Sequence, residues 1–480
     1  MNTTDWIARL RPAARLQGEL LVAPEAPAAA GRRPRSTHER LQATLRRRDG
    51  EAMSPRALRK VQAMLQAVAD PHASEVEGGR HAAAFADWYA AAAPEERRDG
   101  WLLMSEQFAP DAAKVQAAGQ GYETAAGSPE AGQAEIRLRR ALVSPRTRLL
   151  QRFSVPPEGM RFLVDLRAEL LPHLRGDKRL ATLDAELEHL FSTWFDVAFL
   201  ELRRISWDSP ASLIEKLIKY EAVHDIRSWA DVKNRLDSDR RCYGFFHPRL
   251  PQEPLIFVEV ALGGEIAECI TPLLDEAAAP ADLARATTAI FYSISNTQSG
   301  LRGVSFGDSL IKRVVETLRA EFPKLGTFAT LSPIPGLRAW LGRNAGRMLS
   351  LLDDKRLAEL ARADGVPEFG AAQLLHAADR ATELAPRSPL RQLLLQCAAY
   401  YLTRELPDGR PADPVARFHL GNGARVERIN WAGDPSPKGQ KQSYGLMVNY
   451  LYDLKRLDRY RALLAQGHVA ASGAVTSLGF

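Results

Sequence analysis

The spacing of apolar residues divides the chain into two parts with different predicted structures. Up to about residue 190, apolar residues recur every three or four positions, which places them on one face of a helix. Two such faces are formed by Leu58, Val61, Met64, Leu65 and Val68 and by Leu163, Leu166, Leu170 and Leu171. Breaks at Ala93-Pro94 and Gly127-Ser128-Pro129 separate the predicted helices. We therefore expect residues 1–190 to form an all-helical bundle domain.

From residue 191 to 480, segments typical of strands alternate with helical ones. The predicted strands are 255–262, 288–295 and 326–331, followed by a pair at 415–420 and 426–431. The turn of that pair is expected at Gly421-Asn422-Gly423. The predicted helices are 210–220, 308–322, 353–363 and 389–401, the last with Ser388 as its N-cap. This alternation predicts a mixed α/β domain after the helical one.

Composition narrows the class of protein. The chain has 480 residues, of which 45% are hydrophobic and 25% charged, so we expect a soluble protein of two or three domains. No apolar run approaches the ~18 residues that a membrane helix needs. The three cysteines are far apart, which argues against a disulfide framework or a zinc site and fits a reducing cytoplasm. The net charge of +6 suits polyanionic small molecules, and no aromatic-plus-basic motif favours nucleic acid.

A glycine-containing loop joins the predicted strand 288–295 to the predicted helix 308–322. Gly303 and Gly307 let the backbone turn sharply and approach a ligand closely. Free N–H groups at the start of the helix attract an anion, and the helix dipole adds roughly 0.3–1 kcal/mol. The predicted pyrophosphate loop consists of Arg302, Gly303, Val304, Ser305, Phe306, Gly307 and Asp308. Its spacing is neither that of a Walker loop nor that of a dinucleotide fingerprint, and the loop alone fits a simple strand-to-helix connection equally well.

Two further segments carry candidate chemistry. Ser332 ends a predicted strand, and Pro333 and Pro335 after it restrict the backbone, so its hydroxyl is held in place. His419 lies between two apolar residues, and Asn422 nearby is a ready hydrogen-bond partner. Taken alone, Ser332 is typical of a serine that caps the segment after it, and His419 is typical of a buried core histidine. As a pair without a spaced acidic partner, they indicate proton transfer rather than nucleophilic attack.

Several motifs in one order resemble the malonyl-CoA decarboxylase family. The resemblance covers most of residues 190–455. It is carried by Phe291-Tyr292-Ser293-Ile294-Ser295, Gly303-Val304, Leu310-Ile311-Lys312-Arg313-Val314-Val315, the segments 331–336 and 418–423, Arg428-Ile429-Asn430-Trp431 and Asn449-Tyr450. The loop also resembles the coenzyme A loop of GNAT-type acetyltransferases, although Ser305 replaces its middle glycine.

The resemblance implies a helical N-terminal domain that self-associates and a C-terminal domain of acetyltransferase-like fold. It implies conversion of malonyl-CoA to acetyl-CoA and CO2 without a cofactor, since coenzyme A is part of the substrate. The family's catalytic serine and histidine fall on Ser332 and His419 and its CoA loop on 302–308. Ser293 matches another active-site position, and Asn422 and Tyr450 are expected substrate contacts.

Two other functions stay open at this point. One is a CoA-dependent acyltransferase of the same fold, and the other is a non-catalytic sensor of CoA esters. The end of the chain lacks the Ser-Lys-Leu signal of peroxisomal relatives, so we expect a bacterial-type cytoplasmic form that binds neither membrane nor nucleic acid.

Overall fold

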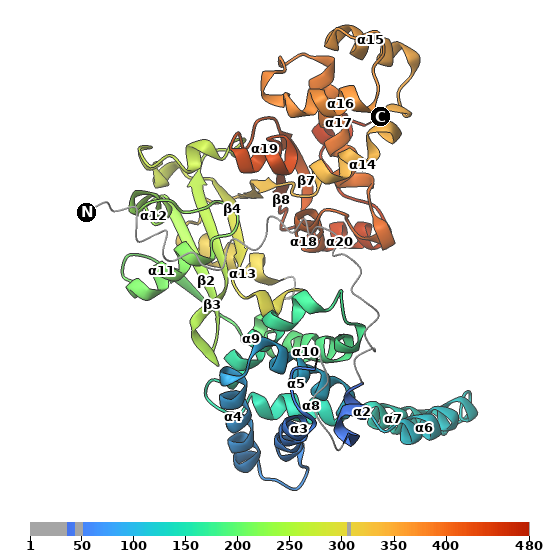
Figure 1. Cartoon of the computed structure of the whole chain (residues 1–480). Coiled ribbons are helices and arrows are strands. Elements are labelled where there is room, and N and C mark those ends of the chain that lie inside the picture. The colour runs from blue at the N-terminus through green and yellow to red at the C-terminus, as the bar shows by residue number, and fades with distance from the viewer. Residues whose placement is uncertain (1–35, 44–50, 305–308, 480) are drawn as a thin grey trace.

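The computed structural model describes residues 36–43, 51–304 and 309–479. Helices make up the N-terminal part of the fold (Figure 1). They are α2 Thr37–Gln42, α3 Pro55–Ala69, α4 Glu75–Ala91, α5 Pro94–Gln107, α6 Ala112–Thr124, α7 Ala131–Leu142, α8 Pro145–Phe153, α9 Gly159–Leu170 and α10 Ala181–Trp194. In the described part of the chain no strand precedes Glu201, so the prediction of a helical N-terminal part is confirmed.

Local sequence explains where these helices begin and which face they bury. Helix α3 starts at Pro55, and the hydroxyl of Ser54 accepts a hydrogen bond from the Ala57 N–H. Its predicted apolar face is buried, with Leu58 and Leu65 fully inaccessible to solvent. Burying a leucine side chain contributes about 1.5–3 kcal/mol, so tertiary packing stabilises the helix more than its intrinsic propensity does.

The C-terminal part contains one eight-stranded mixed sheet. Its strands run in the order β1-β2-β3-β4-β5-β8-β6, with β7 also paired to β8. Only β4 and β5 are parallel, and α13 connects them. The strands are β1 Glu201–Ile205, β2 Arg240–His247, β3 Leu250–Gly263, β4 Thr288–Asn296, β5 Thr327–Thr330, β6 Ser332–Pro333, β7 Arg425–Asn430 and β8 Met447–Leu451.

Helices pack around this sheet, and α14 to α17 extend beyond the end at which β7 and β8 lie (Figure 1). Four predicted helices are confirmed within a few residues, and Ser388 caps the fourth as expected. The helices are α11 Ala211–Tyr220, α12 Trp229–Arg235, α13 Ser309–Glu321, α14 Leu337–Leu349, α15 Asp354–Asp364, α16 Ala371–Asp379, α17 Pro389–Arg404, α18 Pro414–Gly421, α19 Pro437–Ser443, α20 Leu457–Ala465 and α21 Gly473–Thr476. None of the helices in the described ranges is long and apolar enough to span a membrane.

One predicted strand is wrong. Residues 415–420 form helix α18, so Gly421-Asn422-Gly423 ends a helix and is not a hairpin turn. The physical reason is the N-cap: the Asp413 carboxylate accepts hydrogen bonds from the Val415 and Ala416 N–H groups, and Pro414 occupies the first helical position. The second strand of the predicted pair, β7, is confirmed.

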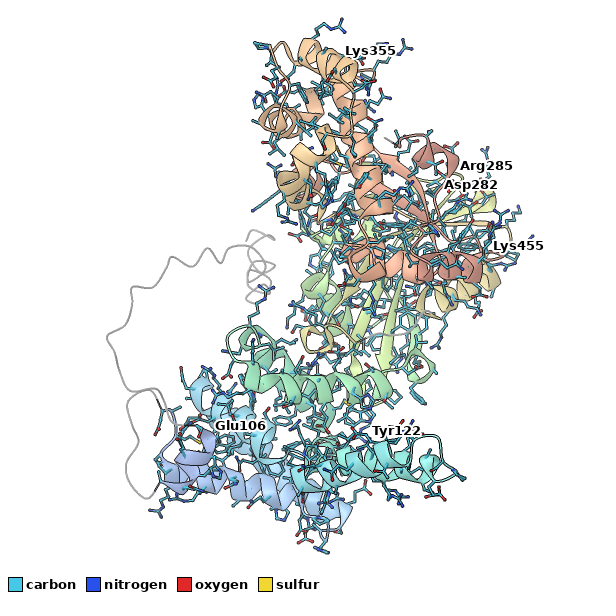
Figure 2. The ribbon with its side chains drawn as sticks, turned by 90° about the vertical axis from the view of Figure 1, so that its right-hand side faces the viewer. Glu106, Tyr122, Asp282, Arg285, Lys355 and Lys455 are labelled. Carbon is cyan, nitrogen blue, oxygen red and sulfur yellow. The ribbon has the colours of Figure 1, made fainter. Side chains whose placement is uncertain are left out.

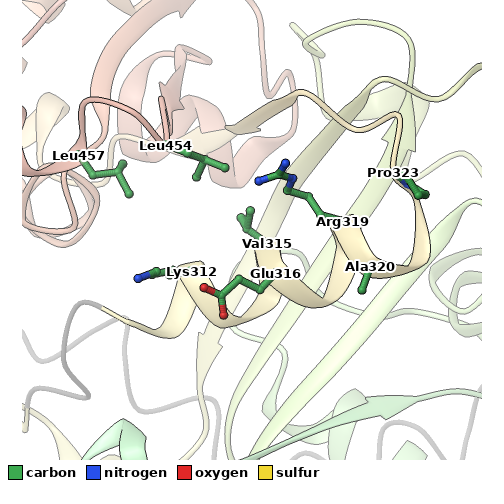
Figure 3. A pocket seen from close by; sticks show the side chains of 8 residues that line it. All are labelled: Lys312, Val315, Glu316, Arg319, Ala320, Pro323, Leu454 and Leu457. Atoms are coloured by element: carbon green, nitrogen blue, oxygen red, sulfur yellow. The ribbon is translucent and has the colours of Figure 1, made fainter.

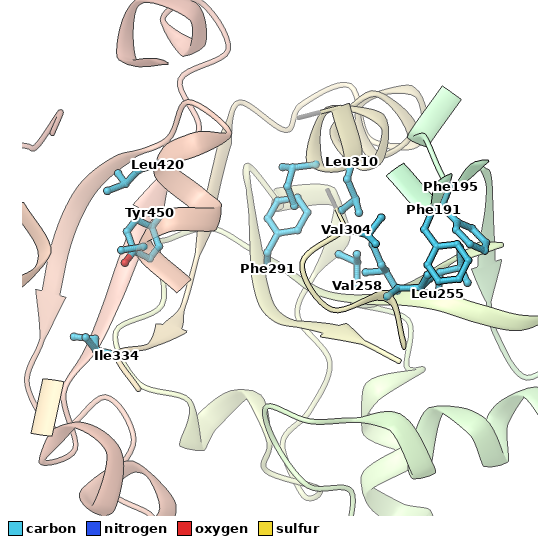
Figure 4. Close-up of a cluster of buried hydrophobic side chains, with 14 of the residues drawn as sticks. Phe191, Phe195, Leu255, Val258, Phe291, Val304, Leu310, Ile334, Leu420 and Tyr450 are labelled. Atoms are coloured by element: carbon cyan, nitrogen blue, oxygen red, sulfur yellow. The ribbon is translucent and has the colours of Figure 1, made fainter. Parts of the chain in front are cut away.

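The helical part and the sheet share one hydrophobic core. Phe191 and Phe195, at the end of α10, lie beside Leu255 of β3 and Val304 (Figure 4). The segment after β4, which includes the short helix η7 Ser299–Leu301, is therefore packed between the two parts.

Candidate active site

Ser332 lies in the short strand β6, immediately after β5. It pairs with Val448 of β8 and is buried. Pro333 and Pro335 follow it, and the chain then enters α14. The backbone of Ser332 is therefore held by two features: the prolines that follow it, as predicted, and its pairing with β8.

His419 meets Ser332 although 87 residues separate them in the sequence. Its Nε2 lies 3.3 Å from the Ser332 Oγ, and its Nδ1 lies 2.7 Å from the hydroxyl of Tyr452. The ring also stacks on Tyr450, with centroids 4.8 Å apart and planes at 26°. The imidazole is therefore held by contacts on both nitrogens and one face.

The hydrogen bonds around this pair run in one direction. The Ser332 hydroxyl donates to the Thr330 Oγ1 at 2.8 Å, and the Tyr450 N–H donates to the same oxygen. Since the serine proton points to Thr330, the Ser332 Oγ accepts from the His419 Nε2–H, and Nδ1 accepts from the Tyr452 hydroxyl. The network thus assigns the proton of the neutral imidazole to Nε2.

Burial determines the charge state of the site. It lowers the pKa of His419 to about 3, and it raises the pKa of Tyr452. At neutral pH the site without ligand therefore holds a neutral imidazole and a protonated phenol. A negative group beside the imidazole would raise this pKa and favour the charged form.

A buried carboxylate joins the two segments that carry the pair. Asp413, the N-cap of α18, is inaccessible to solvent and also accepts a hydrogen bond from the Gly336 N–H at 3.1 Å. The Tyr401 hydroxyl donates to the same carboxylate. A Cβ at Gly336 would lie 2.0 Å from that hydroxyl oxygen, so only glycine fits there. Asp413 thus connects the turn after Ser332 to the helix of His419.

The described part of the predicted phosphate loop follows η7. Gly303 has φ +84°, the left-handed conformation that favours glycine. Arg302 is exposed, whereas Val304 is buried in the shared core. The other four predicted residues, Ser305, Phe306, Gly307 and Asp308, lie outside the described residues.

The remaining predicted residues lie in different surroundings. Ser293 is buried on β4, and its hydroxyl bonds to the Glu221 carboxylate at 2.8 Å. Ser293 pairs with Glu259 of β3, whose side chain bonds to Arg235 of α12, so Ser293 lies on the sheet face that α12 covers. Phe291 and its partner Thr330 lie on the opposite face. Asn422 is the buried C-cap of α18. The structure therefore brings Ser332, His419 and Tyr450 together, leaves Asn422 at the end of the helix that carries His419, and gives Ser293 its own polar cluster.

A pocket of about 460 Å³ opens beside α13 (Figure 3). One wall is a face of α13, and the other is formed by Leu454 and Leu457. Lys312 and Arg319 reach into it from the helix, with Glu316 between them. The pocket contains none of the predicted catalytic residues, but Leu454 follows Tyr452 by two positions.

Sequence reasoning missed Tyr452, Thr330 and Asp413. The signal for Asp413 was present, since Asp413-Pro414 has the N-cap and proline pattern that located the helix after Ser388. For Tyr452 and Thr330 the chain offers no local signal, because their roles depend on a pairing between distant strands.

Two family models and several relatives at about 40% identity match this chain under one family name. The family described as "Malonyl-CoA decarboxylase C-terminal domain" matches residues 198–478, and its "N-terminal domain" counterpart matches residues 108–195. The mitochondrial malonyl-CoA decarboxylase of Rattus norvegicus is 41% identical over 343 residues, which is 67% of this chain and 68% of the relative.

Solved structures agree with this match. The crystal structure of malonyl-CoA decarboxylase from Agrobacterium vitis has a TM-score of 0.76 and 41% identity, and covers 88% of this chain and 100% of the other. The structure of the protein with the same name from Cupriavidus metallidurans has a TM-score of 0.72 and 46% identity, again with 88% and 100% coverage.

Proposed function

Because this chain belongs to the malonyl-CoA decarboxylase family, we propose that it converts malonyl-CoA to acetyl-CoA and CO2. The observation that supports this best is the buried chain of hydrogen bonds through Tyr452, His419, Ser332 and Thr330. This chain presents one hydroxyl and one imidazole to a small carboxylate. A hydroxyl can orient the carboxylate by a hydrogen bond, and an imidazole can transfer a proton.

The thioester carbonyl of the substrate can accept the electrons that CO2 leaves behind. When the bond from the α-carbon to the carboxylate breaks, its electron pair forms an enolate, and one proton on that carbon then completes acetyl-CoA. We assign Ser332 to the malonyl carboxylate, as a hydrogen-bond donor that replaces its bond to Thr330. We assign His419 as the proton donor.

The neutral imidazole carries its proton on Nε2, so a second proton, taken up from solution together with the substrate, goes to Nδ1 and makes the imidazole an acid. The incoming malonyl carboxylate brings a negative charge next to a buried imidazole, and such a neighbour raises the pKa of the imidazole. The charged imidazole is stable while the carboxylate or the enolate is present, and it transfers its Nε2 proton as the enolate forms acetyl-CoA. Tyr452 keeps its own proton: its hydroxyl donates to Nδ1 of the neutral imidazole, and its oxygen accepts from Nδ1–H once the imidazole is charged.

The loop that follows β4 is proposed to hold the phosphates of coenzyme A. Arg302 is exposed for this contact, and Gly303 permits the turn. Lys312 lies in the first turn of α13, about 5 Å along the helix axis from Ser309. We propose that it adds a second cation for the phosphates, and that Tyr450 and Asn422 contact the acyl end, as expected from the resemblance.

A single assay tests the proposed reaction. The purified protein is mixed with malonyl-CoA alone, and acetyl-CoA and CO2 are measured. We expect both products in equal amounts. An acyltransferase would require an added acceptor, and a sensor would bind the ester without turnover.

We also propose that the helical domain, residues 1–190, mediates self-association. Helices α6 and α7 project from it as a hairpin (Figure 1), and Tyr122 lies on this projection (Figure 2). In α6 no residue is buried, and in α7 only Ala134 is buried. Ile136, Leu142 and Val143 are exposed there, and a second copy of the chain would cover them. The cytoplasmic location and the absence of nucleic-acid and membrane binding stay predictions.

A further inference from the structure

One arginine of the helical domain is bound to the segment that begins the phosphate loop. Arg167 of α9 is about 1% exposed. Its Nη1 donates to the backbone carbonyls of Gly300 and Arg302, both at 2.9 Å. One guanidinium nitrogen thus fixes the carbonyls of the two residues on either side of Leu301, immediately before Gly303.

The same helix determines the position of this turn by direct packing. A Cβ at Gly300 would lie 1.9 Å from the backbone oxygen of Val164, so η7 rests against the backbone of α9. Leu301 and Val304 are buried in the shared core on either side of Arg302. The backbone of residues 300–304 is therefore held in place by the helical domain as well as by β4.

Arg167 also determines the charge beside the loop. Its Nε pairs with Asp184 at 2.8 Å and its Nη2 with Glu188 at 3.3 Å. The Glu188 carboxylate lies 3.7 Å from the position that a Cβ at Gly303 would occupy. Without the guanidinium, the Glu188 carboxylate would lie unneutralised beside the place where a polyanion is expected, and like charges repel.

We infer that Arg167 is a positioning residue for the coenzyme A site, through which the helical domain contributes to substrate affinity. This inference rests on the proposed function, in which the loop binds the phosphates of a CoA ester. Arg167 orders the backbone at 300–303 and neutralises Glu188, while the reacting group lies elsewhere, at Ser332 and His419. Its loss should therefore change binding and leave turnover at saturation largely unchanged.

The test compares Arg167→Met with Arg146→Met. Arg146 is a matched control, because it is also buried in the helical domain and donates to the carbonyls of Met104, Ser105 and Thr182 and to Glu186. None of these hydrogen bonds goes to the described residues of η7 or of the loop, 299–304. Both variants lose a buried guanidinium and leave carboxylates unpaired, so both should be less stable. For each, calorimetry gives the Kd for coenzyme A, and steady-state assays give KM and kcat for malonyl-CoA.

We expect Arg167→Met to raise the Kd for coenzyme A and the KM about tenfold with kcat within twofold, and Arg146→Met to change none of them more than twofold. Adding Glu188→Gln to Arg167→Met should recover part of the affinity. If the two arginine variants bind coenzyme A equally well, the inference is wrong. If Arg167→Met does not fold, Arg167→Lys replaces it in the test. Lysine keeps the positive charge but cannot donate to both carbonyls and both carboxylates as the forked guanidinium does, so the Kd for coenzyme A should rise at least threefold. An unchanged Kd refutes the inference. Absence of CO2 from the unaltered protein would instead refute the proposed reaction, and the coenzyme A titrations would still decide the role of Arg167.

Discussion

Replacing Tyr452 with phenylalanine removes one hydroxyl from the proposed catalytic network and little else. The ring stays, so the apolar packing around Phe291 is kept. What is lost is the 2.7 Å hydrogen bond to the Nδ1 of His419, which is buried and has no access to water as a substitute. The variant therefore isolates what the hydrogen bond from Tyr452 contributes to His419.

The size of the effect follows from that bond. Leaving a buried acceptor unsatisfied costs about 1–3 kcal/mol, so the free energy of unfolding should fall by that amount. In the reacting complex the imidazole is charged, and the Tyr452 oxygen accepts a hydrogen bond from its Nδ1–H. If that bond contributes about 1.4–2.8 kcal/mol to the charged imidazole in the reacting complex, its loss slows turnover about 10- to 100-fold.

Two measurements on the Tyr452→Phe variant test this reasoning. Acetyl-CoA formation gives kcat and KM, and urea unfolding gives the stability. Tyr450→Phe is the control for stability, since the buried Tyr450 hydroxyl has no hydrogen-bond partner among the described residues and its removal breaks no bond. A Tyr452→Phe variant with kcat within twofold of the original protein would refute the proposed role of the hydroxyl, and a stability equal to that of Tyr450→Phe would refute the energetic argument.

Three more outcomes are expected. Ser332→Ala should lower kcat at least tenfold while the Kd for coenzyme A, measured by calorimetry, stays within twofold, because the proposed mechanism assigns the serine to the malonyl carboxylate. Gly303→Ala should raise KM severalfold in the same steady-state assay, since φ +84° disfavours any side chain, at about 1 kcal/mol or more. Acid should destabilise the protein, as urea unfolding at several pH values will show. Burial lowers the pKa of His224 and of His419 to about 3, below the ordinary 6.5, so the unfolded chain binds more protons between these values. The free energy of unfolding is at its full value above pH 6.5 and falls as the pH drops below 6.5, by about 3 kcal/mol for each histidine at pH 4.5. An equal free energy of unfolding at pH 7 and pH 4.5 would contradict the burial argument.

Periodicity predicted the fold best where one face of an element is buried. The apolar face of α3 is an example. The start of β4 was predicted by a continuous apolar run instead, since its first six residues are all buried. Strand β2 escaped prediction because all eight of its residues are buried, including Arg240 and Arg241, whose charges obscure the pattern. Arg241 is tolerated there because Glu321 of α13 pairs with it, which no local sequence pattern reveals.

The candidate site was predictable in its members and not in its connections. The motifs around Ser332 and His419 identified the pair, and the structure places them together. Their link to Tyr452 and to Asp413 depends on how β8 and α18 pack, which is a tertiary property. For Ser293 the resemblance implied a place in the same site, but in the structure its hydroxyl bonds to Glu221 and lies apart from Ser332 and His419.

The most direct test of the proposed mechanism compares the original protein with His419→Asn on malonyl-CoA alone. We predict that the original protein releases CO2 and acetyl-CoA in equal amounts without an acceptor, and that His419→Asn binds coenzyme A with similar affinity but forms acetyl-CoA at least 100-fold more slowly, because the amide cannot gain and donate a proton. Turnover by His419→Asn close to that of the original protein would contradict the assignment of His419 as the proton donor.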